Sequence, residues 1–211
     1  MMLFVVTFLA AWSAAVLPSS RGVQTVASVD LARYAGNWFE IARFPNRFQQ
    51  RCAGEVQASY AVRTDGRVDV INRCAGEDGR VIEARGVARI VDTRTYAKLK
   101  VRFAPALLSW LPIAWGDYWV VDLDERYELA AVSEPSRQYL WILSRTPVVE
   151  ESRYKALLLR LADMGLDVQK LELVILSKCL NGTPIAVGSH IVHQRPGDIR
   201  RRRRRFRPGN C

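Results

Sequence analysis

The sequence predicts an all-β domain: eight antiparallel strands that close into an up-and-down barrel, with one C-terminal α-helix packed on its outer wall. Three observations support this prediction. Short runs of alternating polarity follow one another at hairpin spacing, turn signals such as Thr64-Asp65-Gly66 separate them, and helical periodicity begins after the last run. Parallel neighbours would need crossovers of about a dozen residues or more. Eight closed strands make a barrel wide enough for one small ligand.

The expected strands are runs in which polar and apolar residues alternate, so that one face of each strand is buried. Asp65-Gly66 and Asp78-Gly79 favour tight hairpins between successive runs, and residues 104–116 form a longer loop. The eight strands are expected over residues 37–44, 55–63, 67–73, 81–91, 97–103, 117–123, 127–132 and 138–144.

The apolar period changes after the last of these runs. Four residues recur at three- and four-residue spacing and share one helix face: Tyr154, Leu157, Leu158 and Leu161. Pro147 and Gly165 are the expected start and end signals. This helix must lay its apolar face against the barrel, and residues 170–176 are expected to add a short strand beside it.

Two terminal segments are expected to lie outside the fold. Residues 1–27 contain an apolar run of 15 residues, from Leu3 to Leu17. That run is shorter than the roughly 20 residues of a membrane span, which favours a cleaved signal peptide over an N-terminal anchor. We expect the barrel domain over residues 29–178 and a disordered basic tail over residues 180–211.

The net charge of +10 is concentrated in that tail, where eight arginines and one aspartate after residue 194 supply +7. The run Arg200 to Arg205 could bind an anionic membrane surface, at about 1 kcal/mol per charge. The tail lacks the interleaved aromatic residues of many nucleic-acid-binding segments, so no nucleic-acid partner is expected.

Three ordered motifs resemble the signatures of the lipocalin family. The first is "YAGNWFEIARFPNRF", which contains Gly36-Asn37-Trp38; the second is "VVDLDERYELAAV", and the third is "YLWILSRTP", which contains Arg145. The likeness runs from Val29 to Val174 and is greatest to the branch of the bacterial outer-membrane lipocalin and apolipoprotein D. Two features depart from that branch: no cysteine follows the signal segment, and the arginine tail is additional.

The resemblance implies a barrel closed at one end. Gly36, Trp38 and Arg145 match the closure residues of the family, in which the arginine lies across the indole. Such a cation–π contact is worth about 0.5–2 kcal/mol. Five residues match ligand-lining positions of this branch, although an aromatic residue in a strand is also a common core residue: Tyr60, Asn72, Phe103, Tyr118 and Trp141.

The even number of cysteines (Cys52, Cys74, Cys179 and Cys211) indicates disulfides in an exported chain. Cys52 and Cys74 flank a hairpin, with an offset of a few residues that a bulge or loop must absorb. This bridge is favoured. The resemblance to apolipoprotein D keeps a second pairing open, Cys52 with Cys179.

The barrel region offers little chemistry beyond binding. It contains no histidine to activate a serine or cysteine, and no metal site or cofactor is expected, because the two histidines, His190 and His193, lie near the tail. Glu40 is the one strand carboxylate expected to point inward, where a salt bridge is the ordinary role.

The sequence therefore predicts an exported carrier, not an enzyme, that binds a fatty acid, lysophospholipid or similar amphiphile in the periplasm, at the outer membrane or outside the cell. Two alternatives remain. One is a cavity enzyme that uses a cysteine thiol, as in one lipocalin isomerase branch, which would require free thiols. The other is an anionic-surface module that acts through the tail.

Overall fold

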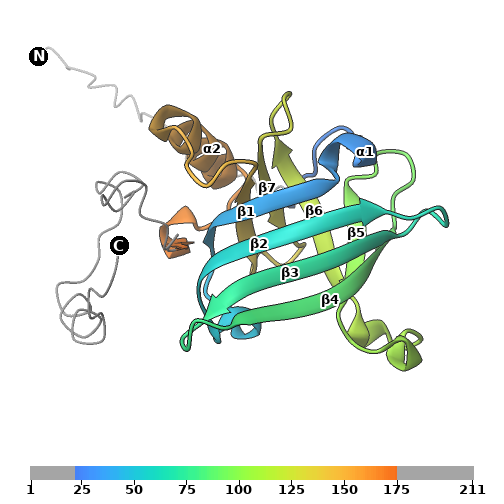
Figure 1. Cartoon of the computed structure of the whole chain (residues 1–211). Coiled ribbons are helices and arrows are strands. Elements are labelled where there is room, and N and C mark those ends of the chain that lie inside the picture. Colours follow the sequence, from blue (N-terminus) through green and yellow to red (C-terminus); the bar gives the residue numbers. More distant parts are fainter. Residues whose placement is uncertain (1–21, 175–211) are drawn as a thin grey trace, which may run out of the picture.

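A computed structural model describes residues 22–174 of the chain, and it confirms the predicted fold class (Figure 1). Every paired strand is antiparallel to its neighbours, in the order β2-β3-β4-β5-β6-β7-β8-β1-β9. The sheet closes because β1 pairs with both β8 and β2. The strands are β1 (Gly36–Arg43), β2 (Cys52–Val62), β3 (Val68–Gly76), β4 (Val81–Ile90), β5 (Lys98–Arg102), β6 (Gly116–Leu123), β7 (Leu129–Ser133), β8 (Leu140–Ser144) and β9 (Glu172–Leu173).

Two α-helices and four short 3₁₀ helices connect or cover the described strands. They are α1 (Leu31–Tyr34), α2 (Glu151–Asp163), η1 (Arg47–Gln49), η2 (Ala106–Leu108), η3 (Pro112–Ala114) and η4 (Val168–Lys170). Among the residues described, no helix is both long and apolar enough to span a membrane.

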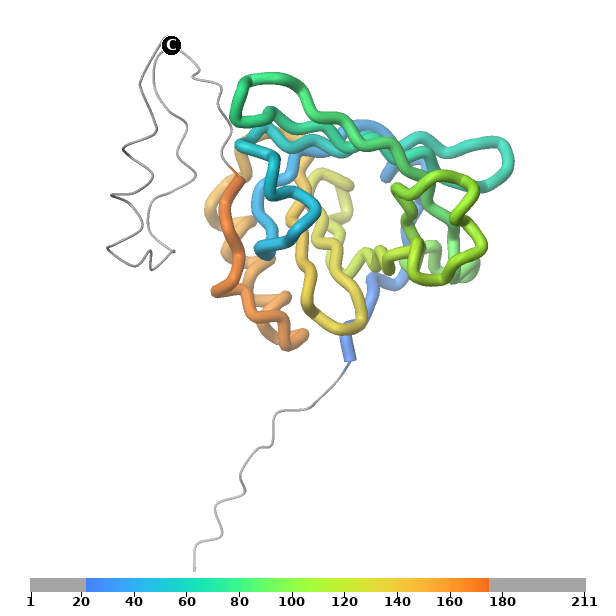
Figure 2. The backbone as a smooth tube through the Cα atoms, turned by 90° about the horizontal axis from the view of Figure 1, so that it is seen from below, coloured from blue at the N-terminus to red at the C-terminus, as the bar shows by residue number. Residues whose placement is uncertain are grey.

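The up-and-down order sends alternate connections to opposite ends of the barrel. Four connections gather at one end, which Figure 2 views from outside: the segment with η1, the β3–β4 turn, the long loop with η2 and η3, and the β7–β8 turn. The β2–β3 turn and α1 lie at the other end. We call the first the open end and the second the closed end.

Facing residues on neighbouring strands define the inner wall. Trp38 lies opposite Ala58, Ala58 opposite Asn72, and Asn72 opposite Ala84, so these four side chains share the inner face. One buried cluster fills the closed half of the barrel around Trp38.

A second buried cluster lies between the outer wall and α2. Leu157 and Leu161 of the helix are 0 % exposed and pack in one cluster with Ile41 and Ile142 of the wall. Each fully buried leucine contributes about 1.5–3 kcal/mol, which holds the helix on the barrel.

The expected boundaries were wrong at several places. The helix begins at Glu151, four residues after Pro147, because Val149 is buried in the outer cluster and Glu150 has an extended backbone. The second strand starts earlier, at Cys52, and the seventh starts later, because Tyr127 lies in a turn with φ of 60°. The final strand is only two residues long.

The short helix α1 was not predicted. Asp30 caps it, and its carboxylate accepts hydrogen bonds from the amides of Ala32 and Arg33. Tyr34, the last residue of α1, is buried at the closed end. Residues 1–21, Cys179, Cys211 and the arginine tail lie outside the described residues. Residues 22–27, which were expected to belong to the signal segment, are described: Val23 is buried in the outer cluster, and the Val26 amide donates to the Val120 carbonyl at 3.0 Å.

Candidate ligand-binding site inside the barrel

Trp38 fills the closed end of the barrel and is 0 % exposed. The ring of Tyr34 lies on it, with centroids 5.0 Å apart, and the indole nitrogen donates to the Tyr34 carbonyl at 2.8 Å. The guanidinium carbon of Arg145 lies 3.9 Å from the centroid of the Trp38 ring system. An aromatic side chain and a cation therefore both contact this tryptophan.

Arg145 also ties the segment around α1 to the barrel. It donates hydrogen bonds of 2.7–3.2 Å to five backbone carbonyls, those of Arg33, Tyr34, Ala35, Asn37 and Tyr127. Burial lowers its pKa from the usual value, but an arginine remains charged at any physiological pH. The five carbonyl dipoles stabilise that charge without a carboxylate.

Gly36 permits this arrangement. Its φ of 92° is in the left-handed region, which side chains rarely adopt, and a Cβ there would lie 3.4 Å from a terminal nitrogen of Arg145. The structure thus brings together the three residues expected at the barrel closure.

Three tyrosines lie next to the closure, and their hydroxyls form a chain. The Tyr34 and Tyr118 hydroxyls are 2.9 Å apart, and Tyr118 donates to the Tyr60 hydroxyl at 3.0 Å. Burial, the largest cause, raises the pKa of all three, that of Tyr60 to about 12. These hydroxyls are therefore neutral hydrogen-bonding groups at physiological pH.

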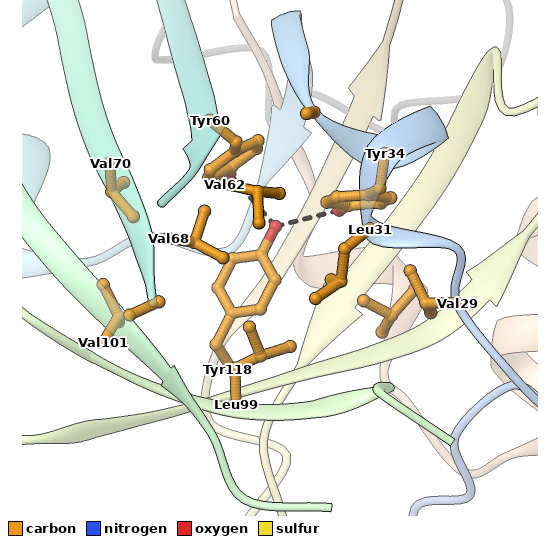
Figure 3. A pocket seen from close by; sticks show the side chains of 13 residues that line it. Val29, Leu31, Tyr34, Tyr60, Val62, Val68, Val70, Leu99, Val101 and Tyr118 are labelled. Carbon is orange, nitrogen blue, oxygen red and sulfur yellow. Dashed lines mark hydrogen bonds between the residues drawn. The ribbon is translucent and has the colours of Figure 1, made fainter. Parts of the chain in front are cut away.

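A small cavity of about 20 Å³ adjoins these tyrosines (Figure 3). Apart from the three phenols, its wall is aliphatic, with side chains from β2 to β6 and from the segment that leads into α1. The lining residues are Val29, Leu31, Tyr34, Ala35, Tyr60, Val62, Val68, Val70, Ala88, Leu99, Val101, Tyr118 and Val120.

A polar cluster lies on β1 and η1, towards the open end. The buried carboxylate of Glu40 accepts hydrogen bonds from Arg43 at 2.8 Å and from Gln49 at 2.7 Å. Burial raises the pKa of Glu40, whereas the bonds from Arg43 and Gln49 oppose that shift. Glu40 is thus salt-bridged to Arg43.

The five expected ligand-lining residues do not all meet at the small cavity. Tyr60 and Tyr118 line it. Asn72 is half-buried and lies one inner-face position nearer the open end than Val70, the residue opposite Tyr60. The Phe103 ring lies against Gly86, so closely that a Cβ on Gly86 would be 2.7 Å from the ring. Trp141 donates to the Gln49 side chain at 3.1 Å and stacks on Tyr139.

The sequence interpretation missed Tyr34 and the aliphatic residues of the N-terminal segment. Asp30 before an apolar residue is a helix-start signal that could have located α1. No periodic pattern in so short a segment shows that it folds across the barrel end.

Cys52 and Cys74 form a disulfide, with their Cα atoms 5.6 Å apart. The register between β2 and β3 shifts twice near Cys52, on either side of Gly54, which absorbs the offset that the hairpin spacing requires. The part of the chain that the structure describes holds no free cysteine.

A closed antiparallel barrel with a flanking helix, plugged at one end by a tryptophan under an arginine, defines a class of small-ligand-binding barrels. A family model for the lipocalin-like domain matches residues 29–175. The chain belongs to the lipocalin family.

Several curated relatives are similar over most of their length. Temperature-induced lipocalin-1 of Arabidopsis thaliana is 38% identical over 158 residues, which cover 74% of this chain and 84% of the relative. Outer membrane lipoprotein Blc of Escherichia coli K12 is 40% identical over 151 residues, 71% of this chain and 81% of the relative. Mouse apolipoprotein D is 28% identical, covering 71% and 78%.

Solved structures agree on the fold. Insecticyanin from the tobacco hornworm, Manduca sexta, superposes with a TM-score of 0.58 over 74% of this chain and 85% of that chain, at 20% identity.

Proposed function

We propose that the protein is an exported carrier that binds a fatty acid, lysophospholipid or similar amphiphile inside the barrel, with the acyl chain inward and the head group near the open end. The observation that supports this most is the division of the interior. The closed half is aliphatic around the small cavity, whereas polar side chains, Glu40, Arg43 and Gln49, lie towards the open end.

The open half of the inner wall is exposed at Ala84, which lies on the inner face, whereas the Phe103 ring covers Gly86 two residues on. The half-buried Asn72 amide beside Ala84 has no hydrogen-bond partner among the described residues, so it is available to a polar group of the ligand.

The cysteines favour a carrier over an enzyme. A thiol-dependent reaction needs a thiolate, and Cys52 and Cys74 are joined to each other. The disulfide also fits an oxidising compartment outside the cytoplasm. The similarity to an outer membrane lipoprotein supports export as well, to the periplasm, the outer membrane or the medium.

The chain-length dependence of binding tests the proposal. Each buried methylene contributes about 0.8 kcal/mol, so the affinity for saturated fatty acids should rise with length and level off once the cavity is full. The measurement is displacement of a fluorescent fatty acid at fixed salt. A flat response, or binding that disappears at high salt or on deletion of residues 195–211, would favour the arginine tail as the binding element.

A matched pair of variants locates the site. Ala84→Trp fills the inner face, whereas Arg85→Trp places the same ring on the outer face of the same strand, where the Arg85 side chain is 70% exposed. Ala84→Trp should weaken long-chain binding roughly tenfold or more, the equivalent of about two displaced methylenes. Arg85→Trp should leave it unchanged. Equal effects would contradict binding inside the barrel.

We further propose that the protein transfers lipid at a membrane surface. The loop that carries η2 and η3 at the open end exposes four large apolar side chains, Leu107 (82%), Trp110 (75%), Ile113 (92%) and, less strongly, Leu108 (37%). Apolar side chains clustered beside the mouth would let the protein contact a bilayer while an amphiphile enters or leaves. By contrast, Trp115 lies against Arg89 and Arg102 and is not part of this exposed set.

Sedimentation with phospholipid vesicles tests the loop. Changing Leu107, Trp110 and Ile113 together to serine should reduce the vesicle-bound fraction severalfold, because apolar area leaves the interface. The control is Val91→Ser with Leu159→Ser, two other exposed apolar residues, 54% and 69% exposed; Val91 follows β4 at the end of that strand opposite to this loop, and Leu159 lies on α2. Equal loss in both variants would argue against a specific role of the loop.

A further inference from the structure

We propose that the closed half of the barrel receives an uncharged oxygen at the inner end of the ligand, a hydroxyl or a ketone, which accepts a hydrogen bond from Tyr60. This inference rests on the proposed carrier function and names the chemistry of the far end of its cargo. The cargo would carry a polar head near the open end and a second, neutral oxygen at its inner end.

The three tyrosine hydroxyls have one hydrogen more than their mutual contacts use. The hydroxyls of Tyr34, Tyr118 and Tyr60 have three hydrogens but make only two contacts with one another. Since Tyr118 gives its single hydrogen to Tyr60, Tyr34 must be the donor in the other contact. The hydrogen of Tyr60 is left over, and no acceptor for it lies among the described residues.

This unused donor is buried. Tyr60 is 9% exposed, and its neighbours in the cavity wall are aliphatic, among them Val62, Val68 and Val70 (Figure 3). A buried donor without an acceptor is costly, so the site favours any occupant that supplies an oxygen. An aliphatic chain end alone would leave the donor unsatisfied.

The size of the cavity limits the occupant. A cavity of about 20 Å³ is large enough for one water-sized group, since about 10–15 Å³ is needed for one. The occupant is thus either one water or the terminal oxygen of a longer molecule whose remainder lies nearer the open end.

The surroundings of Tyr60 favour a neutral oxygen over a carboxylate. The wall of the cavity is aliphatic apart from the three phenols, and none of its lining residues is a cation. Arg145 is already occupied by five carbonyls at the barrel end. A ligand carboxylate there would be buried without a cation of its own, which is strongly unfavourable.

The test compares hexadecanoic acid with ω-hydroxyhexadecanoic acid, which carries the additional oxygen at the end opposite the carboxylate. Titration calorimetry measures both affinities for the full-length protein and for Tyr60→Phe, and the ratio of the two affinities is compared between the proteins. The relative affinity for the ω-hydroxy acid should fall about 2- to 12-fold in Tyr60→Phe, the range of one neutral hydrogen bond.

Two variants serve as controls. Tyr34→Phe removes a hydroxyl from the same chain but leaves the unused hydrogen of Tyr60 in place, so the ratio should stay at its wild-type value. Tyr154→Phe changes a largely buried tyrosine on α2, at the outer wall, and should also leave the ratio unchanged. Thermal melts of each variant confirm folding.

The outcomes separate this inference from the carrier proposal. If neither acid binds the wild-type protein, the carrier function fails. If both acids bind but Tyr60→Phe leaves their ratio unchanged, a buried water occupies the cavity and the inference is overturned. A ratio that falls in Tyr34→Phe and not in Tyr60→Phe would also overturn it, because the unused hydrogen would then be that of Tyr34.

Discussion

Replacing Trp38 by alanine is expected to lower the free energy of unfolding by about 3–5 kcal/mol, as for other buried aromatic residues removed from a core. The indole is fully buried, its nitrogen is hydrogen-bonded to the Tyr34 carbonyl, and Tyr34 and Arg145 cover its faces. Removing it opens a cavity at the barrel end and releases α1. Urea unfolding followed by circular dichroism measures the loss.

Arg145 provides the matching test of the closure. Arg145→Ala should cost less, about 2–3 kcal/mol, because some of the five carbonyls it binds can be hydrated at the barrel end. The double variant should lose less free energy of unfolding than the sum of the losses in the two single variants, because each residue stabilises the other. Strictly additive losses would mean that the stacking contact does not contribute to stability.

Loss of the disulfide is the second large expected effect. The bridge spans 22 residues, and the chain-entropy model gives about 3 kcal/mol for a loop of this length. Cys52→Ser and Cys74→Ser should therefore destabilise the protein equally, and the double variant no further. Unfolding in urea without reductant is the measurement.

The same variants separate the two pairings that the sequence left open. If Cys52 were joined to Cys179, Cys74→Ser would have a small effect, whereas Cys179→Ser would match Cys52→Ser. Addition of reductant to the wild-type protein gives an independent value for the contribution of the bridge.

The barrel could be predicted from the sequence because its signals are local. Alternating polarity gives each strand, and the Asp65-Gly66 and Asp78-Gly79 turns, with φ of 80° and 76° at the glycines, fix the hairpins. Resemblance to the family singled out Gly36, Trp38 and Arg145. Arg145 lies more than 100 residues after the other two, and no periodic pattern connects it to them.

The depth of each side chain along the barrel could not be predicted in the same way. Resemblance to the family placed Asn72, Phe103 and Trp141 on the inner face with Tyr60, but the alternation within each strand does not show how far each residue lies from the closed end. That distance depends on strand stagger and on register shifts, such as the shift between Glu40 and Ala42, which have no clear sequence signal. Tyr34 was missed because α1 is a single turn.

In the proposed complex an acyl chain lies inside the barrel, with its methyl end towards the tyrosines. The most direct measurement uses nuclear magnetic resonance with two spin-labelled stearic acids, labelled near the carboxylate or near the methyl end. We expect the methyl-end label to broaden amide signals of β2, β3 and β5 around Tyr60, Val70 and Leu99. The carboxylate-end label should instead broaden the amide signals of the open-end loops. Broadening confined to the outer surface or to residues 195–211, for either label, would contradict this arrangement.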